Sequence, residues 1–185
     1  MCGIAGIWGN IDTPTLKTMM DKTIHRGPDA EGMFVSPTQA GELGHRRLSI
    51  MDPKGGDRPI YGEHKNRAIV ANGEIYNFRD LRSELGDEQS FTTSSDTEAI
   101  LRLYEERGVK AVEELDGMFA FAIADSEKIL VARDAIGIKP LYYAEKNGAL
   151  IFASELKAFP TGCQNIREFP PGSKYHSDTG FSTFY

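Results

Sequence analysis

The second residue of the chain is a cysteine, and this position gives a thiol a route to catalysis. If Met1 is removed, as is usual when a small residue follows it, Cys2 becomes the first residue and carries a free α-amine. An α-amine has a pKa of about 8 and a thiol a pKa of about 8.5, so the amine can take the proton from the thiol of its own residue. A free cysteine that is merely buried in a strand is the alternative interpretation, and it would be favoured if Cys2 stood alone.

Six further polar segments accompany Cys2 along the chain. In sequence order they are 25–29 (His-Arg-Gly-Pro-Asp), 45–50 (His-Arg-Arg-Leu-Ser-Ile), 72–77 (Asn-Gly-Glu-Ile-Tyr-Asn), 95–98 (Ser-Asp-Thr-Glu), 133–142 (Arg-Asp-Ala-Ile-Gly-Ile-Lys-Pro-Leu-Tyr) and 153–158 (Ala-Ser-Glu-Leu-Lys-Ala). With the opening Met-Cys-Gly-Ile-Ala-Gly-Ile, they resemble the class II glutamine amidotransferases, which are N-terminal-nucleophile hydrolases. The resemblance spans essentially the whole chain. Within this family, the residues of this chain at 26–29 and 72–77 are similar to those in the glutaminase half of glutamine-dependent asparagine synthetases.

The resemblance assigns roles to individual residues. It implies that Cys2 is the nucleophile and that the Asn72 amide and the Gly73 N–H form the oxyanion hole, which stabilises negative charge on the attacked amide oxygen. It implies that Arg47 binds the α-carboxylate of glutamine with its guanidinium fork. Glu74 and Asp96 would hold the α-ammonium. The remaining expected pocket residues are Leu48, Ser49, Ile50 and Met51.

Each of these polar residues also has a local interpretation. Asp96 lies in the first turn of an expected helix, where an acidic residue is favourable in any protein. Asn72-Gly73 is a turn signal, and Glu74 could be an ordinary turn residue beside it. Outside the expected pocket, Arg26 and Asp29 resemble a loop that supports the N-terminal residue. For four other motif residues, structural roles and contacts with a partner domain both remain open; they are Arg133, Asp134, Lys139 and Glu155.

The reaction implied by the resemblance is hydrolysis of L-glutamine through a γ-glutamyl thioester on Cys2, with no metal or organic cofactor. In the family, a second domain uses ATP and Mg²⁺ to convert aspartate and the released ammonia into asparagine. No Ser-Gly-Gly pyrophosphate loop occurs here, since Lys54 and not a serine precedes Gly55-Gly56. We therefore expect residues 1–185 to form one glutaminase domain whose partner is a C-terminal synthetase domain or subunit. The sequence leaves the oligomeric state undetermined, with a homodimer as one possibility.

Two other functions remain as alternatives. One is a glutaminase domain that serves a different acceptor, in cell-surface sugar or antibiotic synthesis. The other is a catalytically silent regulatory module on the same fold. Retention of the nucleophile together with the expected pocket residues argues against a silent module.

The composition limits the class of protein. The 185 residues carry a formal charge of −6, and 40% of them are hydrophobic, which is typical of a globular domain. This mild acidity disfavours nucleic acid and anionic membranes as partners. No apolar run approaches the ~20 residues that a membrane span needs, and no secretory signal begins the chain, so a cytoplasmic protein is expected. Two cysteines and four scattered histidines indicate neither a disulfide scaffold nor a metal site.

Short strands and a few helices must position these residues. Apolar runs predict strands at 4–8, 68–71 and 118–124, and hairpins at 118–132 and 141–153. Helical spacing predicts helices at 15–24, after a Ser95/Glu98 capping box with a stop at Gly108, and at 109–115. Continuous apolar runs indicate antiparallel sheets covered on both faces. The family resemblance implies the corresponding fold, an α+β four-layer αββα sandwich.

Overall fold

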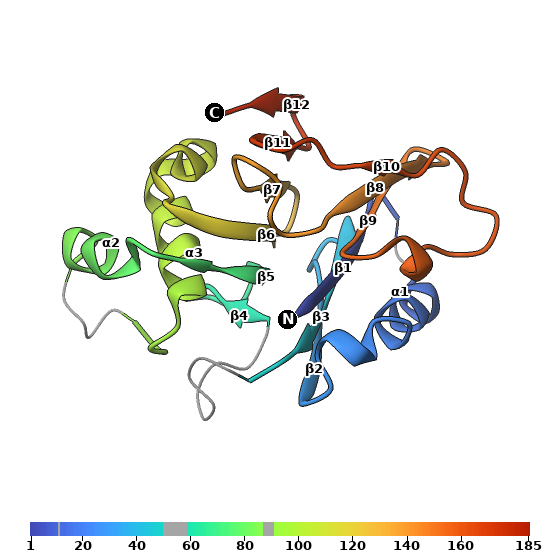
Figure 1. Ribbon diagram of the computed structural model, residues 1–185, viewed down its shortest axis with the longest axis horizontal. Helices are drawn as coiled ribbons and strands as arrows, with labels where there is room; N and C mark the ends of the chain where they lie inside the picture. The colour runs from blue at the N-terminus through green and yellow to red at the C-terminus, as the bar shows by residue number, and fades with distance from the viewer. Residues whose placement is uncertain (11, 50–58, 87–90) are drawn as a thin grey trace.

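Two antiparallel sheets pack face to face in the computed structural model, which describes residues 1–10, 12–49, 59–86 and 91–185 (Figure 1). In spatial order, the strands of the first sheet are β10 (Arg167–Glu168), β8 (Tyr142–Lys146), β9 (Ala149–Ala153), β1 (Gly3–Trp8), β3 (Gly41–Arg47) and β2 (Ala30–Val35). The strands of the second sheet are β12 (Gly180–Thr183), β11 (Ser173–His176), β7 (Ile129–Arg133), β6 (Gly117–Ala124), β5 (Ala68–Ile75) and β4 (Ile60–Tyr61).

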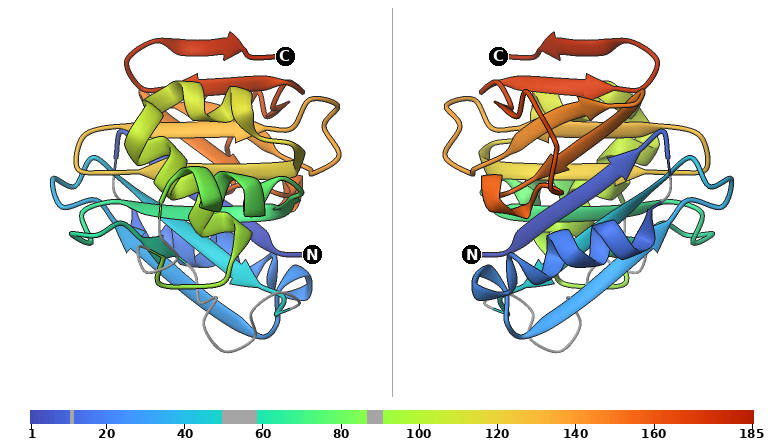
Figure 2. Two further views of the ribbon diagram at one scale, coloured as in Figure 1. Left: turned by 90° about the vertical axis from the view of Figure 1, so that its left-hand side faces the viewer. Right: turned by 90° about the vertical axis from the view of Figure 1, so that its right-hand side faces the viewer.

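Helices cover the outer face of each sheet, as the two side views of Figure 2 show. Helix α1 (Thr13–Asp21) lies on the first sheet, and α3 (Asp96–Arg107) lies on the second with α2 (Phe78–Glu84) beside it. The short 3₁₀ helices are η1 (Ile24–Arg26), η3 (Gly108–Glu114) and η4 (Leu156–Ala158). The order of layers is therefore helix, sheet, sheet, helix, and the predicted αββα sandwich is confirmed.

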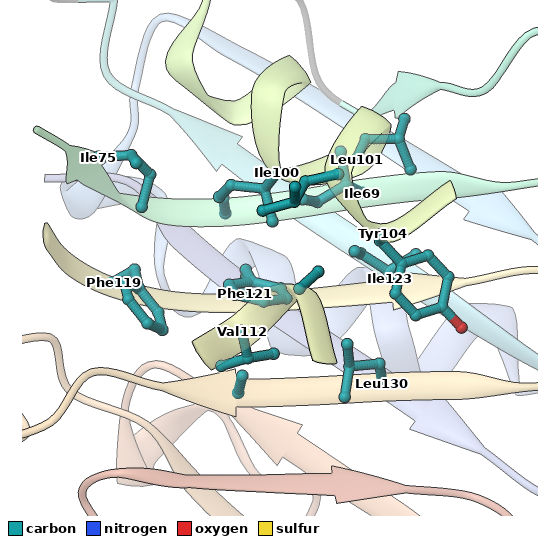
Figure 3. Packing of buried hydrophobic residues seen from close by; sticks show 14 of the residues in the cluster. Ile69, Ile75, Ile100, Leu101, Tyr104, Val112, Phe119, Phe121, Ile123 and Leu130 are labelled. Carbon is teal, nitrogen blue, oxygen red and sulfur yellow. The ribbon is translucent and has the colours of Figure 1, made fainter. Parts of the chain in front are cut away.

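Three apolar layers hold these elements together. Side chains alternate across β1, so that Ile4 and Trp8 enter the core between the sheets while Ile7 packs under α1. Strand β5 alternates in the same way, with Val70 between the sheets and Ile69 facing α3. Figure 3 shows the layer between the second sheet and α3, which is built on aromatic and branched side chains. Because both faces of the central strands are buried, their sequences are continuously apolar.

Most of the predicted elements occur near their expected positions. Strand β6 spans 117–124, a hairpin leads from it into β7, and β8 and β9 are joined by Asn147 and Gly148 at φ +54° and +79°. Positive φ at both positions suits a two-residue hairpin turn. Helix α3 ends at Arg107, and Gly108 at φ +61° caps it as predicted.

The predicted capping box at the start of α3 is wrong in its partners. The Ser95 hydroxyl accepts from the N–H of Thr97, and the Ser95 N–H donates to Thr93 Oγ1. The Glu98 carboxylate reaches the preceding loop, where it accepts backbone and hydroxyl hydrogen bonds from both Thr92 and Thr93 at 2.6–3.0 Å. Burial of this carboxyl raises its pKa, but the four hydrogen bonds outweigh burial and lower the pKa of Glu98 below its ordinary value.

Candidate active site

The candidate site lies at one end of the space between the two sheets, where the inner faces of β1, β3 and β5 continue beyond the apolar core. Cys2 lies directly before β1, two residues from Ile4, and Asn72 lies two residues after Val70 on β5, so each continues the inner face of its segment. Arg47 follows Leu43 on the inner face of β3 by the same rule. Alternation in three neighbouring strands therefore directs a thiol, a guanidinium and an amide toward one place.

The thiol of Cys2 is half-buried and lies against the backbone that follows β3. Its Sγ accepts a hydrogen bond from the N–H of Leu48 at 3.4 Å and lies 3.8 Å from the Leu48 carbonyl oxygen. The carbonyl of Cys2 is also held, because Arg26 Nε donates to it at 2.9 Å. Both the side chain and the main chain of Cys2 are thus fixed by groups from other segments.

Arg26 is fixed in turn by Glu155. Arg26 Nη1 donates to Glu155 Oε1 at 3.0 Å, and His25 Nε2 lies 2.9 Å from the same oxygen. Partial burial raises the pKa of Glu155, but its contacts with Arg26 and His25 outweigh burial and lower that pKa below its usual range. Glu155, whose role the sequence left open, therefore supports Cys2 through Arg26.

Asp29 supports the loop after β3, and its hydrogen bonds in the described part of the chain go to that loop and not to Cys2. Its Oδ2 accepts from the Ser49 N–H at 2.7 Å, and its own N–H donates to the Arg47 carbonyl at 3.1 Å. The expected support by segment 25–29 is therefore divided. Arg26 holds Cys2 directly, whereas Asp29 holds the chain that carries Arg47 and Leu48.

Asn72 and Gly73 lie inside a strand, so the predicted Asn-Gly turn is wrong. Strand β5 continues to Ile75, and each residue from 68 to 75 pairs with β6. This pairing determines the conformation and overrides the local turn signal. Asn72 is 2% exposed, and its buried Nδ2 has no hydrogen-bond partner among the described residues. A Cβ at Gly73 would overlap with the Met118 carbonyl oxygen, so the close approach of β6 requires glycine there.

Asp96 connects the start of α3 to the end of β5. Its Oδ2 accepts from the Ile75 N–H at 2.9 Å, and its Oδ1 accepts from the Thr97 N–H at 2.8 Å. These bonds fix a buried carboxylate beside Glu74, which is exposed at the same strand end. The first-turn position predicted for Asp96 is confirmed. Glu74 is a strand residue and not a turn residue.

A cavity of about 90 Å³ brings these groups together. It is lined by Met1, Cys2, His45, Arg47, Leu48, Ala71, Asn72, Gly73, Glu74, Asp96, Thr97 and Lys139. Of the residues predicted for the pocket, Ser49 lies outside this lining, and Ile50 and Met51 lie outside the described residues. The other seven line the cavity. A larger hollow of about 830 Å³ beside β4 and α3 shares no residue with this cavity and contains no cysteine.

Five lining residues were not predicted for the pocket from the sequence: Met1, His45, Ala71, Thr97 and Lys139. His45 was interpreted as an ordinary surface or core histidine, but its Nε2 donates to the Ala71 carbonyl at 2.9 Å and links the two sheets beside Asn72. Its position two residues before Arg47 on one strand could have identified it. Thr97 follows Asp96 directly. Lys139 enters from the segment after β7, and no local pattern indicates that placement.

The described residues provide no obvious metal site, because none of their His, Cys, Asp and Glu side chains form a group of three suited to hold an ion. The two cysteines are free thiols. The polar groups of the cavity include instead a thiol, two amide or backbone donors, a guanidinium, an ammonium and two carboxylates. Such a set can bind a zwitterion and present a nucleophile to it.

Comparisons with known proteins agree with this arrangement. The family model described as "Glutamine amidotransferase domain" matches residues 1–175. The chain is 43% identical to asparagine synthetase B [glutamine-hydrolyzing] of Escherichia coli (strain K12) over 190 residues, which cover 97% of the chain and 34% of that protein. It is 44% identical to asparagine synthetase [glutamine-hydrolyzing] 2 of Arabidopsis thaliana, covering 97% of the chain and 32% of the relative. The chain thus spans about a third of the length of these curated relatives.

Solved structures give the same fold. A glutamine phosphoribosylpyrophosphate amidotransferase from B. subtilis superposes with a TM-score of 0.85 at 24% identity, covering 100% of this chain and 49% of that one. An allosteric regulatory enzyme of purine biosynthesis superposes with a TM-score of 0.86 at 25% identity and the same coverage. The two-sheet architecture is therefore shared with two enzymes that have diverged far in sequence.

Proposed function

Because the chain belongs to the class II glutamine amidotransferase domain family and is homologous to the glutaminase domain of glutamine-hydrolysing asparagine synthetases, we propose that it hydrolyses the side-chain amide of L-glutamine to glutamate and ammonia. The observation that carries this proposal is the shared cavity of Cys2, Arg47, Asn72 and Asp96. The identity of 43% and 44% to asparagine synthetases favours aspartate as the acceptor of the ammonia over acceptors in cell-surface sugar or antibiotic synthesis.

The nucleophile of the proposed reaction is the Cys2 thiolate. Removal of Met1, which lines the same cavity and is 57% exposed, leaves the α-amine of Cys2 next to its own thiol. That amine takes the thiol proton, so no separate base is needed. Arg26 keeps the Cys2 carbonyl in place through its 2.9 Å hydrogen bond. The Sγ then attacks the amide carbon of glutamine.

Attack places negative charge on the amide oxygen, and Asn72 and Gly73 are the proposed donors to it. Asn72 Nδ2 is already buried and without a partner among the described residues, so it can donate without breaking another bond. Such preorganised donors contribute typically 10²–10³ each to the rate. Ammonia leaves with the proton that the amine received, a γ-glutamyl thioester remains on Cys2, and water then releases glutamate.

The proposed recognition of glutamine uses its two charged ends. The Arg47 guanidinium, 4% exposed, binds the α-carboxylate, since a planar fork suits a planar anion. Asp96 and Glu74 bind the α-ammonium. Leu48 forms part of the cavity wall, and its N–H binds Cys2 Sγ. Together these contacts would select an amino acid of glutamine length and hold its amide against Cys2.

We propose no cofactor for this half-reaction, because the chain's own groups supply nucleophile, base and charge stabilisation. ATP and Mg²⁺ would act in the synthetase domain that accounts for the additional length of the relatives, where ammonia would amidate aspartate to asparagine. That domain or subunit is the proposed partner of a glutaminase domain comprising residues 1–185, with a homodimer of the parent protein left open. Among the described residues no helix is long and apolar enough to cross a membrane, and a cytoplasmic location is proposed.

Ammonia release from glutamine tests the proposed function. Protein from which Met1 has been removed should release ammonia and glutamate in equal amounts. Cys2→Ala should abolish release, whereas Cys163→Ala, which changes the other free thiol, should retain it. Activity that survives Cys2→Ala would contradict the proposal, and so would an inactive wild type that is folded and lacks Met1.

A further inference from the structure

Lys139 is a charged residue of the cavity to which neither the fold nor the proposed reaction has yet given a role. It is 8% exposed and lines the same cavity as Cys2, Asn72 and Gly73. Within the described part of the chain, its ammonium forms no hydrogen bond or ion pair. The Lys139 side chain is largely buried and its ammonium has no counter-ion among the described residues, so its charge is available to an anionic group bound in the cavity.

Lys174 offers a direct contrast, because it is also 8% exposed. Its Nζ donates to Glu113 Oε1 at 2.9 Å and to the Val109 carbonyl at 3.0 Å. The fold therefore supplies one largely buried lysine with a counter-ion and a carbonyl acceptor. The other lines the cavity and has no such partner among the described residues.

The backbone of Lys139 is fixed at both of its polar groups. Its N–H donates to Asp134 Oδ2 at 3.0 Å, and its carbonyl accepts from Arg133 Nε at 2.7 Å. Asp134 and Arg133 are 1% and 4% exposed, and they also bind the backbone of Ile138 and Gly137. These hydrogen bonds fix the segment between β7 and β8, and they therefore fix the position of the Lys139 backbone from which the side chain extends.

The same carboxylate oxygen relates Lys139 to the oxyanion hole. Asp134 Oδ2 also accepts from the Phe119 N–H at 3.2 Å, and Phe119 pairs with Gly73 across β5 and β6. Lys139 is therefore tied to the strand next to Gly73. Arg47 and Asp96, the proposed ligands of the α-carboxylate and α-ammonium, come from β3 and α3 instead.

We propose that Lys139 is a further catalytic residue, whose ammonium stabilises negative charge on the γ-oxygen of the substrate and binds the γ-carboxylate of the glutamate product. This inference rests on the proposed glutaminase function. Charge develops on that oxygen when the thiolate attacks glutamine and again when water attacks the thioester. A fixed cation in a cavity favours both transition states over the neutral amide that precedes them.

The test compares Lys139→Met and Lys139→Arg with the wild type, all without Met1. Lys139→Met should lower kcat roughly tenfold to hundredfold while KM for glutamine changes less than about twofold, because the ground-state amide is neutral. The inhibition constant of glutamate should rise about tenfold or more. Lys139→Arg keeps the charge and should restore most of both values. Lys174→Met should lower the melting temperature and leave kcat unchanged.

Direct binding of glutamate, measured by calorimetry, separates this proposal from the glutaminase function. Weaker glutamate binding to Lys139→Met, with glutamine binding to Cys2→Ala unaffected by the same substitution, supports the role of Lys139 whether or not the wild type turns over. Unchanged glutamate affinity and kcat in Lys139→Met would overturn it. A parallel loss of melting temperature and of affinity for both amino acids would also overturn it, because that pattern indicates a structural residue.

Discussion

Replacing Asn72 by alanine should separate catalysis from stability. Asn72 Nδ2 is buried without a partner among the described residues, so truncation breaks no hydrogen bond of that atom in the folded protein. The free energy of unfolding should therefore fall by less than about 1 kcal/mol. In the transition state the same atom would donate to the oxyanion, and its loss should lower kcat by about 10²–10³, or ~2.7–4 kcal/mol. The expected catalytic loss is therefore several times larger than the expected loss of stability.

Asn77 provides the matched control, because it lies at the other end of the same sequence motif and makes only structural contacts. Its Nδ2 donates to the Glu114 carbonyl at 2.9 Å, and its Oδ1 accepts from the Asp116 N–H at 3.1 Å. Loss of these bonds in Asn77→Ala should cost about 1–3 kcal/mol of stability and leave kcat nearly unchanged.

The assays are steady-state ammonia release and thermal unfolding of both variants. At roughly 2–4 °C per kcal/mol, Asn77→Ala should show the larger fall in melting temperature and Asn72→Ala the larger fall in kcat. An Asn72→Ala protein with wild-type kcat would refute the reasoning. So would an unfolding loss in Asn72→Ala equal to that of Asn77→Ala, since it would show that the buried amide is held by the fold.

Four other substitutions or modifications give separate expectations. Arg47→Lys should raise KM for glutamine about tenfold with a smaller change in kcat, because an ammonium cannot form the bidentate contact; equal KM values would contradict the assignment. Gly73→Ala should lower both the melting temperature and activity because its Cβ overlaps with the neighbouring strand; an unchanged melting temperature would count against that. Glu98 has a lowered pKa in the folded protein, so its ionised form contributes stability above its unfolded pKa and loses it as pH falls through the folded pKa. Urea unfolding of Glu98→Gln should accordingly show a deficit at neutral pH that shrinks in acid, and a constant deficit would be the contrary result. Protein that retains Met1 should release ammonia poorly, since Cys2 then lacks its α-amine; matched rates with and without Met1 would exclude that base.

The layers of the fold could be predicted from the sequence because a strand that is buried on both faces is continuously apolar. The run 118–124 is apolar without alternation, and β6 is buried between the other sheet and α3. Helix α3 was also predictable, since Ser95 and Gly108 mark its ends by local chemistry. The Asn72-Gly73 turn was wrong because pairing with β6 along the whole of β5 outweighs a dipeptide preference. Non-local contacts decided that segment, and a single sequence does not display them.

The candidate site was predicted mainly through the family resemblance, and seven of its expected residues line one cavity. Spacing along the sequence explains part of this result, because Cys2, Arg47 and Asn72 all extend inner faces of strands. Lys139 could not be placed in this way. Its position depends on Asp134 joining two segments that are distant in sequence, which only the folded structure reveals.

The central claim is that the Cys2 thiol forms a covalent bond to the substrate. Protein without Met1 should be mixed with glutamine, quenched in acid within a turnover, digested and examined by mass spectrometry, with the other free thiol, Cys163, as an internal control. The peptide that begins at Cys2 should gain the mass of one γ-glutamyl group, and the peptide with Cys163 should gain none. Ammonia release at full rate with a γ-glutamyl group on another residue, or with Cys2 replaced by alanine, would contradict the account.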